Sequence, residues 1–469
     1  MATGARKAKP DAGPPAGDPI FEPLHFRNLT VKNRLFRSNI SGRFDNYNGS
    51  GNPVRFNWEE KFAKGGIGTI ITSFVPVSME GRIVPNYAMI DRDERIPFWR
   101  EMGKRIHQYD CKMIMQLSHS GRQRDITAFD TPNNLSPTDD PDAVHGLHAN
   151  RLTTEQIAVL VDKFAQGARR AREAGLDGVE THSANGYLFT QFLSATINDR
   201  TDQYGGSLAN RARFLLEVIR AIRAEVGDDF HVQSKISAVD NGNAIFPWEK
   251  KGTTIEDTLQ VVKWLEDAGI DAIHVSMGNS FPHPQNPAGE FPVEEAAKIY
   301  NQMLPGGGIR ALRNWLIFQT PPTRAVFKRV WERTCPPLDQ VEGINLPYAQ
   351  QIKQAASVPI ICTGGFQTAS VIRHAIEAGQ CDGVSMARTL VANNDLPNLF
   401  AAGYDRAPKP CTYCNKCMLN TLVNPLGCYD ERRYASREAM VEQIFSVYHP
   451  SDTWQPMSDT TKTTKGKTS

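Results

Sequence analysis

The sequence predicts an α/β protein with a (β/α)8 TIM barrel, and two observations carry this prediction. The first is a repeated phrase in which Ala-Gly precedes a short turn and a β-rich run, with clear copies at Ala174, Ala268 and Ala378. A fainter copy follows Ala63. Each copy combines a helix end, a closing glycine and the start of a strand, so it marks the joint of a β/α unit. The second observation is the number of strand candidates, which matches the eight strands of such a barrel.

Each strand candidate is a short, nearly uninterrupted apolar run, which is typical of parallel strands that are covered on both faces. The candidates lie near residues 33–38, 68–73, 111–117, 177–182, 229–236, 271–276, 358–362 and 381–386. Thr153 and Gln156 form a plausible capping box for the helix before the fourth strand. A doubly wound sheet is the alternative fold, but no early Gly-x-Gly-x-x-Gly segment supports it.

The chain divides into four expected parts. Residues 1–18 are rich in Ala, Gly, Pro and Lys and are expected to form a disordered arm. The barrel should occupy 19–405, followed by a cysteine-containing extension packed on it at 406–450 and a flexible tail at 451–469.

A long insertion is expected at 279–345, between strands six and seven, with one or two helices that include residues 326–331. An insertion after a barrel strand lies on the active-site face, so it could form a lid or a substrate wall. A peripheral or dimer-contact subdomain is the open alternative.

The composition is that of an ordinary globular enzyme, with 40% hydrophobic and 22% charged residues. A net charge of +2 gives no global attraction to nucleic acid or to an anionic membrane. No apolar run approaches the length of about 20 residues that spans a bilayer, and no signal peptide is recognisable. We therefore expect a cytoplasmic protein without nucleic-acid or membrane partners, and a homo-oligomer remains open. Eight cysteines in 469 residues do not make a disulfide scaffold.

Three polar residues lie within six positions of one another where the fourth strand candidate ends. His182 ends the strand, and Asn185 and Tyr187 lie in the loop after it. In barrels, chemistry gathers at the C-terminal ends of the strands. An imidazole N–H and an amide N–H can hold one carbonyl oxygen together, and a phenol can then donate a proton to carbon. The alternative is a loop that is held by its own hydrogen bonds.

The segments after the seventh and eighth strand candidates contain residues that can bind an anion. Gly364 and Gly365 follow the seventh strand candidate, where glycine lets backbone N–H groups approach an anion. Arg388 follows the eighth, and its guanidinium can pair with a phosphate through two hydrogen bonds. Barrels commonly bind phosphate at this place. An ordinary turn is the alternative for the glycine pair.

With their surroundings, these residues resemble the old yellow enzyme family of FMN-dependent NAD(P)H ene-reductases, which is related to the N-terminal barrels of 2,4-dienoyl-CoA reductase and trimethylamine dehydrogenase. The motifs that carry the resemblance are His182-x-x-Asn185-x-Tyr187, Asn198-x-Arg200, Asn210-Arg211, Asn33-Arg34, Gln116-Leu-x-His119, Thr363-Gly364-Gly365-Phe366 and Ala387-Arg388. The resemblance implies that residues 19–405 are an FMN-binding TIM barrel, with NADPH or NADH as the electron donor.

The resemblance also implies a reaction and a role for each site residue. The C=C bond of an α,β-unsaturated aldehyde, ketone, acid or ester would be reduced in a ping-pong cycle, with hydride transfer through flavin N5. His182 and Asn185 would hold the activating oxygen of the substrate, and Tyr187 would protonate the α-carbon. The residues implied to bind FMN are Ser38, Asn39, Ser41, Gln116, Lys235, Gly364, Gly365, Ala387 and Arg388.

Three positions depart from the family pattern. Lys235 stands where the family usually has an arginine near flavin N1 and C2=O, so the charge is kept but the planar fork is lost. Ser41 keeps a hydroxyl that could reach flavin O4. Ser118 is small where many members place an aromatic side chain in the substrate pocket. The substrate range therefore cannot be copied from another member.

Four cysteines, Cys411, Cys414, Cys417 and Cys428, invite an iron–sulfur or zinc interpretation. Larger relatives carry a [4Fe–4S] cluster just after the barrel, but Thr421 holds the position of their fourth ligand. We therefore favour a thiol-rich segment without metal. Two other functions compete with ene-reduction: an iron–sulfur flavoprotein demethylase or desaturase, and a flavin-free barrel that acts as a binding protein.

Overall fold

The computed structural model describes residues 17–449, apart from residues 41, 125–133, 241–251 and 307. The tail predicted for 451–469 and most of the arm predicted for 1–18 lie outside the described residues. The last residue of that arm differs from the prediction. Asp18 is buried, accepts a hydrogen bond from the backbone N–H of Ile20 and forms an ion pair with Arg373. Asp18 therefore ties the chain to the barrel ahead of the first strand.

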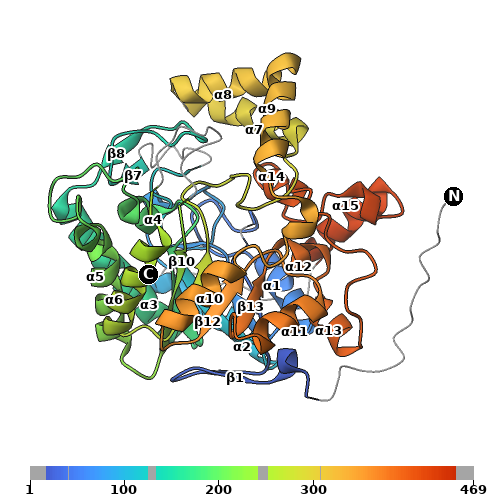
Figure 1. Cartoon of the computed structure of the whole chain (residues 1–469), viewed down its shortest axis with the longest axis horizontal. Helices are drawn as coiled ribbons and strands as arrows, with labels where there is room; N and C mark the ends of the chain where they lie inside the picture. The colour runs from blue at the N-terminus through green and yellow to red at the C-terminus, as the bar shows by residue number, and fades with distance from the viewer. Residues whose placement is uncertain (1–16, 41, 125–133, 241–251, 307, 450–469) are drawn as a thin grey trace, which may run out of the picture.

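Eight parallel strands form a closed barrel, which confirms the predicted fold class (Figure 1). In the order in which they pair around the barrel, the strands are β3 (Leu35–Arg37), β4 (Thr69–Ile71), β6 (Lys112–Ser118), β9 (Gly178–Ser183), β10 (His231–Ser237), β11 (Ala272–Ser276), β12 (Ile360–Thr363) and β13 (Gly383–Met386). The last of them pairs with the first and so closes the circle. Each strand overlaps its predicted range.

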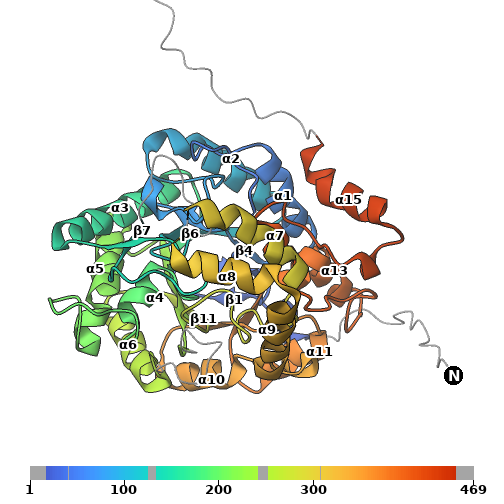
Figure 2. The same cartoon turned by 90° about the horizontal axis from the view of Figure 1, so that it is seen from above.

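Helices surround the barrel on the outside, as Figure 2 shows from above. They are α1 (Val54–Lys64), α2 (Ile96–His107), α3 (Thr154–Glu173), α5 (Leu208–Val226), α6 (Ile255–Asp267), α10 (Leu346–Ala355), α11 (Ala369–Glu377) and α13 (Leu396–Ala401). The predicted capping box of α3 is present, with reciprocal hydrogen bonds between Thr153 and Gln156. Apolar residues three to four apart give α3 one buried face, which includes Ile157, Leu160 and Phe164.

The repeated αβ joints have the geometry that their glycines predict. Gly175, Gly269 and Gly379 have φ values of 76°, 95° and 66°. Gly66, in the fainter copy, has φ 92°. Only glycine adopts this left-handed region without strain, and it lets each helix end and turn directly into the next strand.

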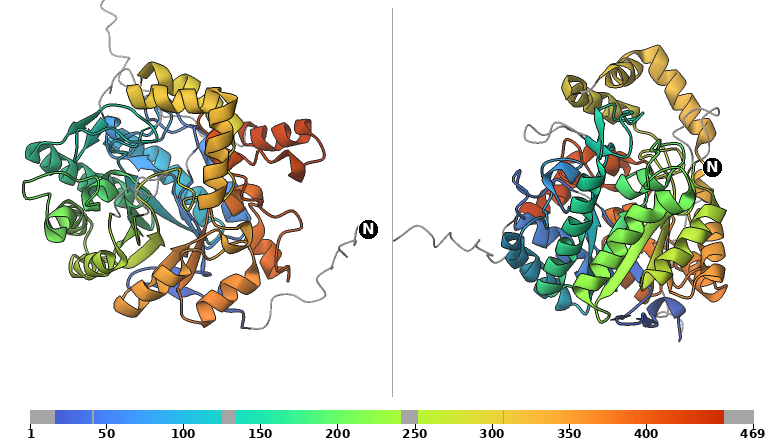
Figure 3. Two further views of the ribbon diagram at one scale, coloured as in Figure 1. Left: turned by 45° about the horizontal axis from the view of Figure 1, so that its top comes forward. Right: turned by 90° about the vertical axis from the view of Figure 1, so that its left-hand side faces the viewer.

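The insertion after β11 contains three α-helices instead of the one or two expected. They are α7 (Val293–Met303), α8 (Ile309–Gln319) and α9 (Pro321–Thr334), and α9 includes the predicted 326–331 segment. A separate apolar cluster holds them to the extension after the barrel, where Tyr300 and Phe318 pack in one cluster with Leu419 of α14 (Lys416–Asn420). Figure 3 shows the three helices above the barrel, at the end opposite the hairpin strand β1 (Leu24–His25).

Several short elements were not predicted from the sequence. A hairpin of β1 and β2 (Thr30–Val31) precedes the barrel, β5 (Val75–Pro76) extends beside β6, and β7 (Asn134–Ser136) pairs with β8 (Ala149–Arg151). The remaining α-helices of the described residues are α4 (Leu188–Leu193), α12 (Arg388–Ala392) and α15 (Arg437–Phe445). Among the described residues, no helix is long and apolar enough to cross a membrane.

Candidate active site

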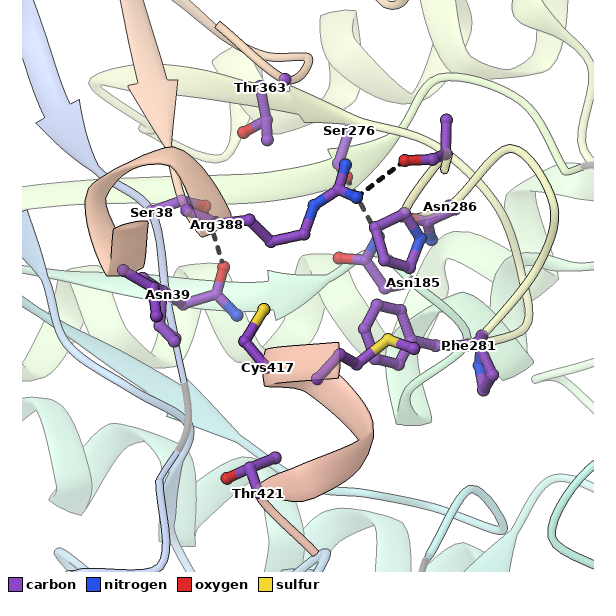
Figure 4. Close-up of a pocket in the computed structure, with 18 of the residues that line it drawn as sticks. Ser38, Asn39, Asn185, Ser276, Phe281, Asn286, Thr363, Arg388, Cys417 and Thr421 are labelled. Carbon is purple, nitrogen blue, oxygen red and sulfur yellow. Dashed lines mark hydrogen bonds between the residues drawn. The ribbon is translucent and has the colours of Figure 1, made fainter. Parts of the chain in front are cut away.

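A cavity of about 240 Å³ lies at the C-terminal ends of the barrel strands (Figure 4). Both ends of the insertion and the extension after the barrel contribute to its wall. The predicted site residues that line it are Ser38, Asn39, His182, Asn185, Tyr187, Lys235, Gly364, Gly365, Ala387 and Arg388. Of the other two, Gln116 is fully buried in β6 outside this lining, and Ser41 lies outside the described residues. The fold therefore brings distant segments of the sequence together at one place.

Lys235 places a buried cation at the cavity. Its Nζ donates a hydrogen bond to Ser38 Oγ at 3.1 Å and a second one to Asn39 Oδ1. Burial lowers the pKa of Lys235 to about 8, although the carboxylate of Glu180 acts in the opposite direction. The amine is therefore mostly protonated at neutral pH, and its position is fixed by two neighbours from the end of β3.

His182 lies beside Lys235, because the two residues are partners in the parallel pairing of β9 and β10. Burial, followed by the charges of Lys235 and His274, lowers the pKa of His182 well below its ordinary value. Its Nε2 lies 3.5 Å from Asn39 Nδ2, and its Nδ1 is buried without a hydrogen-bond partner among the described residues. His182 is therefore neutral, and one ring nitrogen is left for a bound molecule.

Tyr187 lies against His182 at the start of α4. The ring centroids of Tyr187 and His182 are 4.7 Å apart. The ring centroids of Tyr187 and Phe74 are 5.0 Å apart, and these two rings form a T-shaped contact. These contacts hold the phenol at the cavity wall. Gly186, with φ 86°, makes the close turn that brings Tyr187 back over the end of β9.

Asn185 lines the cavity but does not present its amide hydrogens to it. Its Nδ2 donates to Ser276 Oγ at 3.0 Å and to the backbone oxygen of Met277 at 3.1 Å. The residue has φ 61°, and its backbone N–H donates to Ser237 Oγ. Both amide hydrogens are thus used to hold the end of β11. The two-donor arrangement predicted for His182 and Asn185 is not formed in this conformation, and His182 alone offers a nitrogen.

A buried polar network lies one layer deeper in the barrel and was missed by the sequence analysis. The Glu180 carboxylate accepts hydrogen bonds from Gln116 Nε2 at 2.7 Å and from Gln233 Nε2. It also lies 2.8 Å from His274 Nδ1, and His274 Nε2 lies 2.6 Å from Thr363 Oγ1 at the cavity. Burial would raise the pKa of Glu180, but His274 and Lys235 keep it below its ordinary value. Glu180 therefore stays ionised, and the network around it links five strands.

The network follows from strand alternation. Side chains two residues apart point to the same side of a strand, so Glu180 shares the inward face with His182, and Gln233 shares it with Lys235. His274 has the same relation to Ser276. Large polar residues at alternate positions of buried strands were therefore a signal that the sequence contained.

The predicted phosphate end of the cavity contains Gly364, Gly365 and Arg388. Gly365 has φ 70°, and Arg388 Nη1 donates to the backbone oxygen of Ala288 at 2.7 Å. The same nitrogen donates to Asn415 Oδ1, so the extension after the barrel helps to orient the guanidinium.

The donor and acceptor groups that line the cavity, together with Gln116 behind that lining, fit an FMN molecule. Gln116 Oε1 is buried without a partner among the described residues and could accept from the N–H of a flavin ring. Lys235 supplies a cation near that end. At the other end, Thr389 Oγ1 also lacks a partner among the described residues and lies next to Arg388. A polar ring system and a phosphate thus each find complementary groups.

The outer wall of the cavity includes the insertion, which the sequence suggested as a lid or substrate wall, and two segments that were not assigned to the substrate pocket, the extension and the loop before α3. The insertion contributes Phe281, the extension contributes Met418, and the loop before α3 contributes His145. His145 Nδ1 lies 2.7 Å from Asp142 Oδ1. The insertion fixes this loop from above, because Tyr300 donates to the backbone oxygen of Val144 at 2.8 Å. The insertion is therefore part of the pocket wall.

The four cysteines of the extension are free thiols. Cys417 lines the cavity, while Cys411 Sγ accepts from the backbone N–H of Tyr413 at 3.4 Å and Cys428 Sγ accepts from Arg433 at 3.1 Å. Burial raises the pKa of Cys411 to about 11. Within the described ranges, no group of three or more His, Cys, Asp or Glu side chains is arranged to hold a metal ion.

The barrel and this pocket define a TIM-barrel oxidoreductase of the flavin-dependent class. The chain belongs to the NADH:flavin oxidoreductase / NADH oxidase family, whose model matches residues 19–302. The matched range includes the motif at β9, whereas the motifs at β12 and β13 lie outside it.

Two curated relatives and one solved structure illustrate the similarity. The chain is 27% identical over 431 residues to an NADH oxidase of Thermoanaerobacter brockii, covering 89% of this chain and 58% of that protein. It is 29% identical over 452 residues to a cinnamate reductase of Clostridium sporogenes, covering 91% and 60%. A 2-naphthoyl-CoA reductase complex shares the fold with a TM-score of 0.70 at 22% identity, covering 88% and 56%. The chain thus spans little more than half the length of these proteins.

Proposed function

We propose that this protein is an FMN-dependent NAD(P)H ene-reductase that reduces the C=C bond of α,β-unsaturated carbonyl compounds. The observation that carries the proposal is the meeting of Lys235, neutral His182 and Tyr187 at one cavity in a flavin-family barrel. The cinnamate reductase among the relatives supports this substrate class, since cinnamate is an α,β-unsaturated acid.

Several residues of this chain would hold the cofactor. Arg388 and the backbone at Gly364 and Gly365 would bind the phosphate, and Gln116 and Lys235 would face the polar edge of the ring system. FMN, when bound, supplies hydride transfer from NAD(P)H to the alkene. The protein contributes orientation and charge.

The substrate would be activated and protonated by the residues beside the cofactor. A neutral His182 can donate an N–H to the carbonyl oxygen, which draws electron density away from the C=C bond. Tyr187, against the same imidazole, would protonate the α-carbon, because a phenol with a pKa near 10 carries its proton at neutral pH. Asn185 would act by holding the end of β11, with its amide turned away from the substrate.

The absorption spectrum and the flavin and iron content of the purified protein test this proposal. We expect a yellow protein with stoichiometric FMN and no iron, which NADPH or NADH bleaches in the absence of oxygen. A colourless protein that takes up no FMN would instead be a flavin-free binding protein. A brown protein that contains iron would point to the iron–sulfur demethylase or desaturase.

A further inference from the structure

The outer face of α8 carries a row of exposed apolar side chains, which we call the apolar ridge. Ile309, Leu312 and Leu316 are 83%, 44% and 47% exposed, and their spacing places them on one side of the helix. The opposite side of α8 is fixed, because Asn314 Nδ2 donates to the backbone oxygen of Val144 at 2.8 Å. The ridge therefore points away from the loop that the helix covers. Figure 1 shows α8 and α9 at the end of the molecule opposite β1.

The same two helices concentrate positive charge. The chain has 53 basic and 51 acidic residues, and six of the basic residues but only one acidic residue lie in 309–334. The rest of the chain therefore contains more acidic than basic residues, although the whole protein has a net charge of +2. The six basic residues are Arg310, Arg313, Arg324, Lys328, Arg329 and Arg333.

Ion pairs within the protein neutralise only part of this charge. Arg310 forms an ion pair with Asp140 at 2.7 Å, and Lys328 Nζ lies 3.9 Å from a carboxylate oxygen of Glu332. The neighbouring helix α7 adds two acidic residues and one basic residue. With α7 and Asp140 included, seven basic residues still face four acidic ones. An excess of positive charge thus remains beside the apolar ridge.

A lipid surface with negative charge matches both properties. Helices that lie in a membrane interface combine exposed aliphatic side chains with arginine and lysine, and they bind more tightly when the lipids are anionic. A second copy of this chain is a poorer match, because a symmetric contact through this face would bring the same positive charges together. Protein interfaces depend mainly on aromatic and arginine anchors, whereas the ridge is aliphatic and α9 adds Val326, which is 64% exposed.

The insertion also connects the ridge to the wall of the active-site cavity. Phe318, on the buried face of α8, belongs to the same apolar cluster as Met418 and Leu419. Met418 and Leu419 line the cavity. The ridge and this part of the cavity wall therefore belong to one packed unit at the same end of the barrel (Figure 3).

We propose that α8 and α9 dock the protein on a membrane surface that contains anionic phospholipids. The apolar ridge would insert among the lipid headgroups, and the arginines beside it would pair with lipid phosphate and carboxylate groups. The net charge of the whole chain, from which no membrane partner was expected, does not reveal this local excess. The proposal does not depend on which reaction the cavity performs.

Co-sedimentation of the purified full-length protein with phospholipid vesicles tests this surface. At low salt, vesicles of equal parts phosphatidylserine and phosphatidylcholine should bind the protein at least about tenfold more tightly than phosphatidylcholine alone, and added salt should weaken the binding. Arg313→Gln and Arg329→Gln should each lower the affinity about fivefold, because these exposed side chains each add roughly that factor near an anionic surface. The double variant Ile309→Ser, Leu316→Ser should lower it at least about tenfold.

Val159→Ser and Lys263→Gln are the matched controls. Their side chains are exposed on α3 and α6, outside the insertion, so both variants should bind like the wild type. The melting temperature of each variant shows whether it is folded. Should the double variant not fold, the two arginine variants and the wild-type preference for anionic vesicles decide.

Three results would overturn the proposal. The first is a wild-type protein that binds no vesicles at low salt, or a folded double variant that keeps the full affinity. The second is binding to polyglutamate but not to vesicles, which would assign this face to an acidic protein. The third is a wild-type dimer, detected by light scattering, that the double variant converts to a monomer, because a second copy would then cover the ridge.

Discussion

Replacing Tyr187 with phenylalanine is expected to slow the reaction of the reduced enzyme with an alkene by roughly 10²–10⁴-fold, the usual contribution of a positioned general acid. The substitution removes the phenolic proton and leaves the ring that packs on His182 and Phe74. Reduction of the enzyme by NAD(P)H should be nearly unchanged, because no proton from Tyr187 is needed there. Anaerobic stopped-flow absorbance measures the two half-reactions separately.

Tyr87→Phe is the matched control for this experiment. Tyr87 is a second phenol on the same cavity, and its ring centroid lies 6.0 Å from that of Phe74. Its loss should leave both half-reactions close to the wild-type rates. If Tyr187→Phe slowed both half-reactions equally, Tyr187 would have a structural role and another group would have to be the acid.

Replacing Lys235 with methionine is expected to lower the flavin midpoint potential by roughly 90 mV at pH 7. Two unit charges about 4 Å apart interact by about 4 kcal/mol at an effective dielectric constant near 20. For a two-electron couple, about 1.4 kcal/mol corresponds to about 30 mV. Removing the cation disfavours the more negative, reduced flavin, so the potential falls. Because burial lowers the pKa of Lys235 to about 8, the difference should be largest below that pH and should shrink above it.

The variant Lys235→Arg tests whether the flavin potential depends on the positive charge of the side chain or on its shape. It keeps the positive charge that Ser38 and Asn39 hold in place, so its potential should stay within about 30 mV of the wild type, which is about a tenfold change in the equilibrium constant. Spectroelectrochemical titration from pH 6 to about pH 9 measures all three proteins. An unchanged potential in Lys235→Met at pH 7 would place Lys235 away from the flavin ring.

The barrel could be predicted from the sequence because each turn from a helix to the next strand is encoded within a few consecutive residues. A glycine such as Gly175 closes a helix and opens a strand within a few residues, and this pattern recurs at Gly269 and Gly379. The short pairs β1–β2 and β7–β8 carry no such pattern, since strands of two or three residues have no measurable alternation. The three helices of the insertion bury their apolar faces on one another and on α14, a partner that periodicity alone does not reveal.

The active-site residues that belong to one sequence motif could be predicted. Side-chain orientations and wall residues that depend on tertiary contacts could not. His182 and Tyr187 lie together because His182 is in β9 and a turn of three residues after β9 leads directly to Tyr187. Asn185 belongs to that motif too, yet its amide is directed by Ser276 and Met277 of another strand, which no local pattern shows. The outer wall, to which Phe281 and Met418 both contribute, depends on how the insertion and the extension pack.

Anaerobic reoxidation of the reduced protein by an enone tests the central claim most directly. The protein is reduced with one equivalent of NADPH or NADH and then mixed with 2-cyclohexenone, cinnamaldehyde or cinnamate, while flavin absorbance and products are followed. The proposed function predicts that the yellow colour returns and that the saturated product forms in an amount equal to the reductant. A reduced flavin that persists with every unsaturated aldehyde, ketone, acid and ester, but is oxidised at once by oxygen, would contradict it.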